Sequence, residues 1–244
     1  MVKPWLLPSP REVAASAWEG LGDGLGPRFC VWGDHGCVQL GSITGAVLTS
    51  LRRLFVGYFL SLFLGAALGF GIARSKWIAE TLGTLVLGLQ ALPSICWLPL
   101  AVLWFGLSEA AILFVVLMGS LLSMTITVEA GVRNIPPILI RAARTMGARG
   151  FTLYGRVILP AAMPAMISGA KIGWTFAWRS LLAGELIFVA GGLGQLLKTG
   201  QDTNDMARVI AVMGVIIALG LTIEVLVFAR IERRVRERWG YDRS

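Results

Sequence analysis

The sequence predicts an all-α integral membrane protein that crosses the bilayer with about five helices. Of its 244 residues, 56% are hydrophobic and only 15% are charged, and the mean hydropathy is +0.73. Soluble domains average about 45–50% apolar and about 25% charged residues, so a soluble core could not absorb this excess. The apolar residues also fall in long runs separated by short charged segments, which is typical of spans and loops.

The sequence contains five apolar runs, each about as long as, or longer than, the ~20 residues that a helix needs to cross the hydrocarbon core. They cover 54–73, 82–105, 110–128, 161–190 and 209–229. The first three runs contain no charged residue, whereas the fourth contains Lys171, Arg179 and Glu185, and the fifth contains Glu224. We therefore expect a membrane domain over 46–232, preceded by a non-spanning segment (1–45) and followed by a basic tail (233–244).

Proline and glycine mark particular points within these runs. Pro93 and Pro99 interrupt the second run, and we expect them to bend that span and expose Gln90 and Ser94 to an internal path; a plain kink is the alternative. Gly65 and Gly69 stand four residues apart in the first run. This small-residue spacing predicts close helix packing inside the bundle.

Charged residues within a span are costly and are candidates for function. Arg179 and Glu185 are six residues apart, about 600° around a helix, so they do not share a face and each needs a partner elsewhere. Arg179 could attract an anionic substrate or could bond structurally to backbone carbonyls, and Glu185 could help hold a gate. Lys171 lies near enough to a span end to extend its amine towards water.

The distribution of Lys and Arg predicts the orientation. With the N-terminus outside, 13 of these residues lie in the inner segments and 7 in the outer ones. Since basic residues concentrate on the cytoplasmic side, the C-terminal tail is expected in the cytoplasm. Arg52 and Arg53 adjoin the first span on the outer side and oppose this bias.

The first 45 residues are rich in Pro, Gly and Trp. Ser9, Pro10 and Glu12 form a capping-box pattern that predicts a helix from Pro10 to about Gly20, with Val13, Ala17 and Leu21 on one face. This helix either lies on the membrane surface or packs on the protein. Further along, Cys30 and Cys37 flank Asp34 and His35; they could be unpaired thiols, a disulfide or part of a zinc site, although zinc would need further ligands.

A polar segment at 133–160 separates the third and fourth spans. Its sequence Arg141-Ala142-Ala143-Arg144-Thr145-Met146-Gly147-Ala148 predicts a helix with a small, flat surface, followed by a sharp turn at Gly147. We expect Pro160 to prevent simple continuation into the next span. Two short helices joined at a glycine would form a compact projection that could fit a partner; an ordinary basic loop is the alternative.

This segment resembles the EAA coupling loop of binding-protein-dependent ABC importer permeases, whose pattern is Glu-Ala-Ala, three residues, Gly, nine residues and Ile-x-Leu-Pro. Ala142, Ala143, Gly147, Leu159 and Pro160 are in register with it. The resemblance covers about residues 6–240 and is strongest to the branch for aliphatic sulfonates, taurine, nitrate, bicarbonate and thiamine precursors. It is carried by Leu7-Pro8-Ser9-Pro10, Leu103-Trp104-Phe105-Gly106, Gly131-Val132-Arg133, Ala177-Trp178-Arg179 with Glu185, and Gly192-Leu193-Gly194.

The chain departs from the family pattern in two ways. Arg141 replaces the glutamate of the coupling loop, and Val157 replaces its isoleucine. Family members usually have a further helix before the Leu-Pro-Ser-Pro segment, so the start is truncated or misassigned, or the chain keeps a five-span core. The resemblance implies a type I ABC importer permease fold whose ATPase-coupling residues are Arg141, Ala142, Ala143, Gly147, Ala148, Leu159 and Pro160, on a coupling helix at 141–151.

The same resemblance implies a permease that moves a small anionic solute inward and has no catalytic or metal site. Expected partners are ABC ATPase subunits, an extracytoplasmic solute-binding protein and a second permease copy in the bacterial inner membrane. ATP and Mg belong to the ATPase, because the chain has no GxxxxGK[ST] motif. Gly192 and Gly194 would lie in an external loop that seals the outer gate. A secondary transporter or channel, and a membrane-embedded enzyme, are the alternatives.

Overall fold

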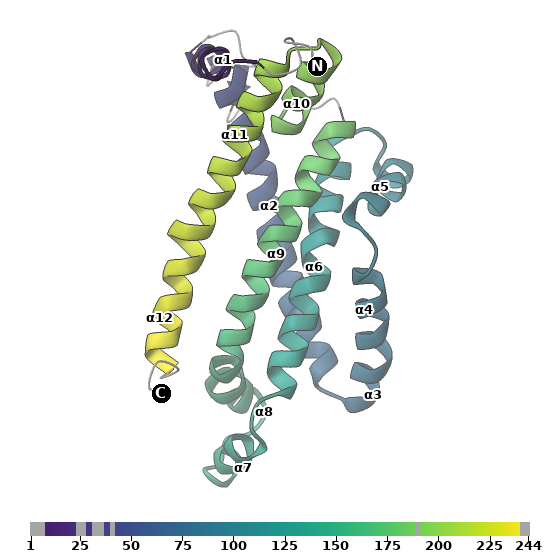
Figure 1. Ribbon diagram of the computed structural model, residues 1–244. Coiled ribbons are helices and arrows are strands. Elements are labelled where there is room, and N and C mark those ends of the chain that lie inside the picture. The colour runs from purple at the N-terminus through teal and green to yellow at the C-terminus, as the bar shows by residue number, and fades with distance from the viewer. Residues whose placement is uncertain (1–7, 23–27, 31–36, 40–41, 189–190, 240–244) are drawn as a thin grey trace, which may run out of the picture. The chain divides into compact units, whose positions relative to one another are not determined.

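The computed structural model describes residues 8–22, 28–30, 37–39, 42–188 and 191–239, and Figure 1 shows their order along the chain. For 28–30, 37–39, 236, 238 and 239 it describes the backbone alone. The elements are α1 (Pro10–Gly22), β1 (Arg28–Cys30), β2 (Cys37–Gln39), α2 (Ser42–Ala73), α3 (Lys76–Ile78), α4 (Thr84–Gln90), α5 (Leu98–Phe105), α6 (Glu109–Arg133), α7 (Pro137–Thr145), α8 (Gly150–Leu153), α9 (Leu159–Ile187), α10 (Leu193–Asp202), α11 (Met206–Ile223) and α12 (Ala229–Trp239).

The helical class is confirmed, with one short antiparallel ribbon, β1–β2, as the only sheet among the described residues. Four described helices are long and apolar enough to cross a membrane, or five if one bent pair counts as a span. The first span begins at Ser42 and not at Leu54, so Arg52 and Arg53 lie inside it. The hydropathy pattern alone places the boundary after these arginines because it does not account for the carboxylates that neutralise them.

The second predicted span is bent, as its prolines predict. It consists of Lys76–Gln90 and Ser94–Phe105, bent by 99° at the break. Pro93 lies in this break, as expected for a residue without a backbone donor. Pro99, however, lies in the first turn of α5, where the missing N–H costs no helical hydrogen bond. Pro99 therefore starts a helix and does not kink one.

The expected interruption at Pro160 is also wrong, because Gly150–Ile187 forms one helical span. A π-helical turn, Tyr154–Ile158, lies immediately before α9. Such a turn shifts the backbone hydrogen bonds by one residue, which accommodates a proline that an α-helical ladder would exclude. The span ends at Ile187, and residues 189–190 of the predicted range lie outside the described residues.

The chain divides into two compact units, and α2, α6 and α9 contribute to both. The first unit comprises Met1–Gly57, Ser94–Val116 and Trp178–Thr222, and the second comprises Tyr58–Pro93, Leu117–Ala177 and Ile223–Ser244. The first unit contains a cluster of Ala46, Leu193 and Val212. The second contains a cluster of Ile135, Ala143, Leu153, Ile158 and Ala162.

Close packing of α2 against α6 in the second unit explains the two glycines. A Cβ at Gly69 would lie 2.7 Å from both the Thr125 carbonyl oxygen and Val128 Cβ. A Cβ at Gly65 would lie 2.9 Å from the Leu121 carbonyl oxygen. Any side chain at these positions would push the helices apart, so the predicted packing inside the bundle is confirmed.

The N-terminal helix α1 also begins as predicted. The Ser9 backbone N–H donates to Glu12 Oε2 at 2.8 Å, and the Glu12 N–H donates to Ser9 Oγ at 3.3 Å, which is a capping box. Gly20 packs directly against Ile43, so this helix packs on the protein at the start of α2. Leu21, on the predicted apolar face, is 51% exposed.

The candidate cysteine site falls mostly outside what the structure describes. Cys30 lies opposite Cys37 in the backbone register of β1 and β2. Asp34 and His35 lie outside the described residues. Within the described part of the chain, no three His, Cys, Asp or Glu residues group as metal ligands would.

Candidate functional site

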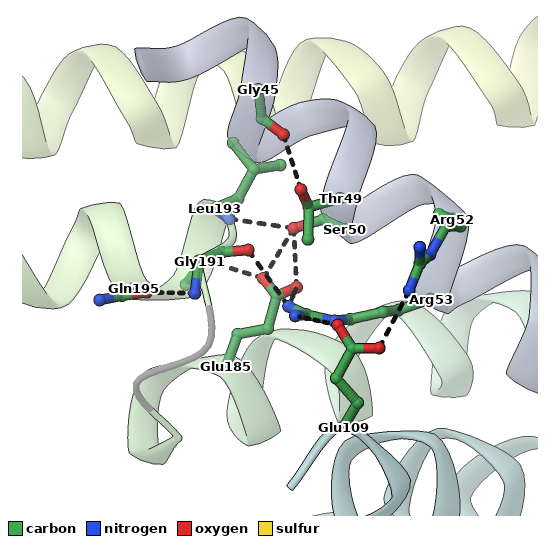
Figure 2. Close-up of polar contacts among 11 residues, drawn as sticks. Gly45, Thr49, Ser50, Arg52, Arg53, Glu109, Glu185, Gly191, Leu193 and Gln195 are labelled. Carbon is green, nitrogen blue, oxygen red and sulfur yellow. Dashed lines mark hydrogen bonds and ion pairs between the residues drawn. The ribbon is translucent and has the colours of Figure 1, made fainter. Parts of the chain in front are cut away.

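A network of charged side chains, buried at Arg53 and Glu185, joins three helices of the first unit (Figure 2). Glu185 on α9 is 1% exposed, and Arg53 on α2 is 2% exposed. Ser50, also on α2, donates to the Glu185 carboxylate at 2.7–2.8 Å. Arg53 Nη1 approaches Glu185 Oε1 at 3.2 Å. We define Ser50, Arg52, Arg53, Glu109 and Glu185 as the α2–α9 charge network.

Arg53 bridges two carboxylates and so extends the network to α6. Its Nη2 lies 2.9 Å from Glu109 Oε1, while Arg52 Nη2 lies 2.9 Å from Glu109 Oε2. Arg53 Nη1 also donates to the Gly191 carbonyl oxygen at 3.2 Å. Two arginines therefore meet two glutamates, which leaves no net charge. This balance matters because a buried unpaired charge costs several kcal/mol.

Glu185 also anchors the start of α10. The Gly194 N–H donates to Glu185 Oε2 at 3.1 Å, and the Leu193 N–H donates to Ser50 Oγ at 2.9 Å. The first N–H groups of a helix lack partners in the helix itself and favour a nearby negative charge. A Cβ at Gly192 would overlap the Glu185 carboxylate, so no side chain fits there. The structure thus brings the predicted residues Glu185, Gly192 and Gly194 together.

The expected external loop after Glu185 is largely helical, which corrects the prediction. Residues Leu193–Asp202 form α10, since the network supplies acceptors for the first N–H groups. Asp202 pairs with Lys198 at 2.7 Å. Asp205 accepts a hydrogen bond from the Arg208 N–H at 3.0 Å, which caps the start of α11.

The other predicted pathway residues do not join this network. Arg179 is exposed, and within the described chain its side chain has no ion pair or hydrogen bond. Gln90 and Ser94 are half-buried, in α4 and at the start of the 3₁₀ turn Ser94–Trp97. Lys171 lies 3.6 Å from Glu224 Oε1 and 3.7 Å from Glu232 Oε2 in the second unit.

The α7–α8 loop in the second unit holds the predicted coupling residues. α7 ends at Thr145, and Gly147 follows with φ +87°, a conformation that favours glycine. The Gly147 N–H donates to the Arg144 carbonyl at 3.0 Å, and the Ala148 N–H donates to the Ala143 carbonyl at 2.9 Å. This pair of bonds is a Schellman motif. The expected two short helices joined at a glycine are therefore present, but the single coupling helix at 141–151 is not.

The two faces of this loop differ. Ala143 is 3% exposed and packs with Leu153 and Ile158, so it supports the loop from inside. Arg141 and Ala142 are exposed, Ala148 and Pro160 are half-buried, and Leu159 is 39% exposed.

Three apolar side chains protrude around the exposed residues: Ile138 (71% exposed), Met146 (82%) and Phe151 (94%). They are not part of the coupling pattern in the sequence. Large apolar residues within a polar loop were the available signal, since such exposure marks a contact surface. We call Ile138, Arg141, Ala142, Met146 and Phe151 the coupling surface.

Comparison with known proteins gives a consistent result. Residues 57–237 match the family described as binding-protein-dependent transport system inner membrane component. A probable ABC transporter permease protein of Brucella melitensis is 31% identical over 193 residues, covering 79% of this chain and 78% of the relative. The taurine transport system permease protein of Escherichia coli is 26% identical over 227 residues, covering 91% and 78%.

Other relatives, at 28–31% identity, are named as permeases for aliphatic sulfonates, nitrate and riboflavin. Among solved structures, an inward-facing methionine ABC transporter, MetNI, matches with a TM-score of 0.68 and 24% identity. The match covers 78% of this chain and 94% of that chain. This structural likeness confirms the fold.

Proposed function

Since the chain belongs to the family of binding-protein-dependent transport system inner membrane components and is an ABC importer permease subunit, we propose that it moves a small anionic solute inward on energy supplied by separate ATPase subunits. The observation that carries this proposal is the α7–α8 loop. It combines a rigid turn at Gly147 with a surface of protruding apolar side chains.

The coupling surface is suited to a partner because its base is rigid. Ala143 and the Schellman bonds fix α7 to its neighbours, whereas Met146 and Phe151 remain exposed. Buried apolar anchors supply most of the affinity in protein interfaces. In this proposal an ATPase subunit covers the surface, and closure of the ATPase pair moves the attached helices as rigid bodies.

The α2–α9 charge network would serve a different step of transport, the closing of the outer gate. It holds α10 through the Gly194 and Leu193 backbone N–H groups and through the Gly191 carbonyl. Because Glu185 bonds both to α2 and to the start of α10, its loss would release the start of α10. We propose that α10, with Gly192 and Gly194, belongs to the outer gate and that the network positions it.

The proposed solute is a small anion. Taurine, sulfonates and nitrate, named for relatives, carry a sulfonate group or a negative charge, whereas riboflavin does not. Arg179 is the exposed cation on α9 without a partner in the described chain, and it would attract an anion electrostatically. Gln90 and Ser94 remain proposed contacts along the path.

The remaining partners follow from the same assignment. ATP and Mg would bind the ATPase subunits, while an extracytoplasmic solute-binding protein would deliver the solute and a second permease copy would complete the pathway. The excess of Lys and Arg in the inner segments supports an external N-terminus and a cytoplasmic C-terminus.

A transport assay tests this proposal. The chain would be reconstituted in liposomes with its co-purified partners, and uptake of radiolabelled taurine, nitrate or an alkyl sulfonate would be followed with and without ATP on the ATPase side. The proposal predicts uptake that needs both ATP and the solute-binding protein. Equal flux without ATP would instead favour a channel or secondary transporter.

A further inference from the structure

The second unit contains a hollow beside the α7–α8 loop, and it shares only Phe151 with the coupling surface. Its volume is about 840 Å³, and its lining includes Arg74, Arg144, Arg149, Phe151 and Tyr154. The three arginines come from separate segments: the residue after α2, the last turn of α7 and the residue before α8. The fold therefore brings three arginines from separate segments into the lining of one hollow.

No carboxylate of the described residues pairs with these arginines. Within the described residues, none of the three side chains has an ion pair or a side-chain hydrogen bond. The sequence contains no Asp or Glu between Glu129 and Glu185, and no acidic residue of the described part of the chain lines the hollow. Three positive charges that line one hollow, with no facing carboxylate among the described residues, favour an anion there over water.

Phosphate is the anion that this arrangement fits. Arginine presents a planar fork of N–H donors that binds phosphate oxygens in pairs. The side chains of Phe151 and Tyr154 add apolar wall to the same hollow, which suits a ligand whose phosphate is joined to a less polar part.

The position of the hollow indicates where that phosphate comes from. Arg74 directly follows Ala73, the last residue of a 32-residue span, so it lies at the level where a bilayer ends. Trp77, three residues later, is 82% exposed, and Trp and Tyr concentrate at this interface. In the orientation proposed above, this is the cytoplasmic leaflet, whose anionic headgroups attract basic residues.

We propose that Arg74, Arg144 and Arg149 form a binding site for a phosphate-bearing anion, supplied by the headgroup of an anionic membrane lipid. The occupied site would tie the α7–α8 loop to the membrane edge of α2, because its arginines belong to both. It rests on the proposed function only through the orientation, and the arginine cluster itself is independent of solute and partners.

Native mass spectrometry of the purified full chain tests the site directly. Retention of phosphatidylglycerol and phosphatidylcholine would be compared for wild type, the pocket variant (Arg74→Gln, Arg144→Gln, Arg149→Gln) and a control variant (Arg230→Gln, Arg233→Gln, Arg234→Gln). The control removes the same charge from α12, outside the hollow. Since each arginine near anionic headgroups is worth about fivefold in binding, the pocket variant should lose roughly a hundredfold.

A single variant, Arg149→Gln, guards against misfolding and should lose about fivefold. Competition with inorganic pyrophosphate separates the two sources of phosphate: displacement of lipid only at high pyrophosphate concentration supports the headgroup. Stronger binding of pyrophosphate than of lipid would overturn the lipid source. Equal lipid retention by the pocket and control variants would overturn the site. Loss of ATPase co-purification in the pocket variant, with lipid retention unchanged, would also overturn the site, because the arginines would then bind the ATPase.

Discussion

Removing the Ser50 hydroxyl tests the α2–α9 charge network with the smallest change that the structure allows. Ser50 is fully buried, donates to Glu185 and accepts from the Leu193 N–H at 2.9 Å. Ser50→Ala deletes one oxygen and leaves the volume of the site almost unchanged. The substitution removes the hydrogen bond from Ser50 to the charged Glu185 carboxylate. It also removes the oxygen that accepts a hydrogen bond from the Leu193 N–H at the start of α10.

The expected loss of stability follows from these two contacts. A hydrogen bond to a charged group contributes about 1.5–3 kcal/mol, and a buried donor left without a partner costs about 1–3 kcal/mol. We expect Ser50→Ala to lower the free energy of unfolding by about 2–4 kcal/mol. This is less than the sum of the two contributions because the effects overlap. For a chain of this size that corresponds to a drop in Tm of roughly 5–15 °C.

Thermal unfolding of the purified protein in detergent measures this difference. Ser61→Ala is the matched control, because Ser61 is also fully buried in α2 but donates only to the Tyr58 carbonyl of its own helix, at 2.7 Å. The control should melt close to wild type. If Ser50→Ala melts within about 2 °C of Ser61→Ala, below one kcal/mol by the same scale, the network does not hold α10 as described.

Three further substitutions test other parts of the structure. Gly147→Ala should reduce solute uptake at unchanged membrane abundance, since a φ of +87° strains a side-chain-bearing residue, whereas Gly155→Ala, with open space and no positive φ, should transport normally. Gly69→Ala should lower Tm by roughly 2–12 °C, because overpacking costs about 1–3 kcal/mol, while Gly71→Ala, where a Cβ meets nothing, should not. Tyr58→Phe removes a 2.8 Å hydrogen bond to a backbone carbonyl of α9, and such a bond should contribute about 0.5–1.5 kcal/mol to stability. A drop in Tm of more than roughly 10 °C would be larger than this contribution allows and would contradict the expectation.

The sequence predicts the helical class and the local turns because those depend on neighbouring residues. The capping box at Ser9 and the turn at Gly147 are set by hydrogen bonds within a few positions. The charge network is different in kind. Arg53 and Glu185 are 132 positions apart, and the hydropathy pattern treats Arg53 as a flanking charge that ends a span.

Whether a proline breaks a span could not be predicted from the sequence either. Pro93 and Pro160 look alike in the sequence, yet the chain bends by 99° near the first and runs on through the second. The π-helical turn Tyr154–Ile158 makes the difference at Pro160. A single sequence does not reveal where such a turn forms, because it depends on packing against Ala143 and the other residues of its cluster.

The position of the α7–α8 loop in the chain was predictable from the sequence, but the residues that it exposes were not. The glycine and the two alanines mark it in the sequence, whereas the exposure of Met146 and Phe151 follows from how α7 and α8 pack. Ala143 is instead buried and packs in the cluster beneath the loop.

The central claim, that this permease subunit works with a separate ATPase, is tested most directly by purification from its native membrane. The tagged chain would be extracted in mild detergent, and co-purifying proteins would be identified by mass spectrometry, beside a variant with a disrupted coupling surface (Met146→Asp, Phe151→Asp). We predict that a nucleotide-binding ATPase co-purifies with wild type and is lost from the variant. An intact, folded wild-type chain that repeatedly brings down no ATPase would contradict the account.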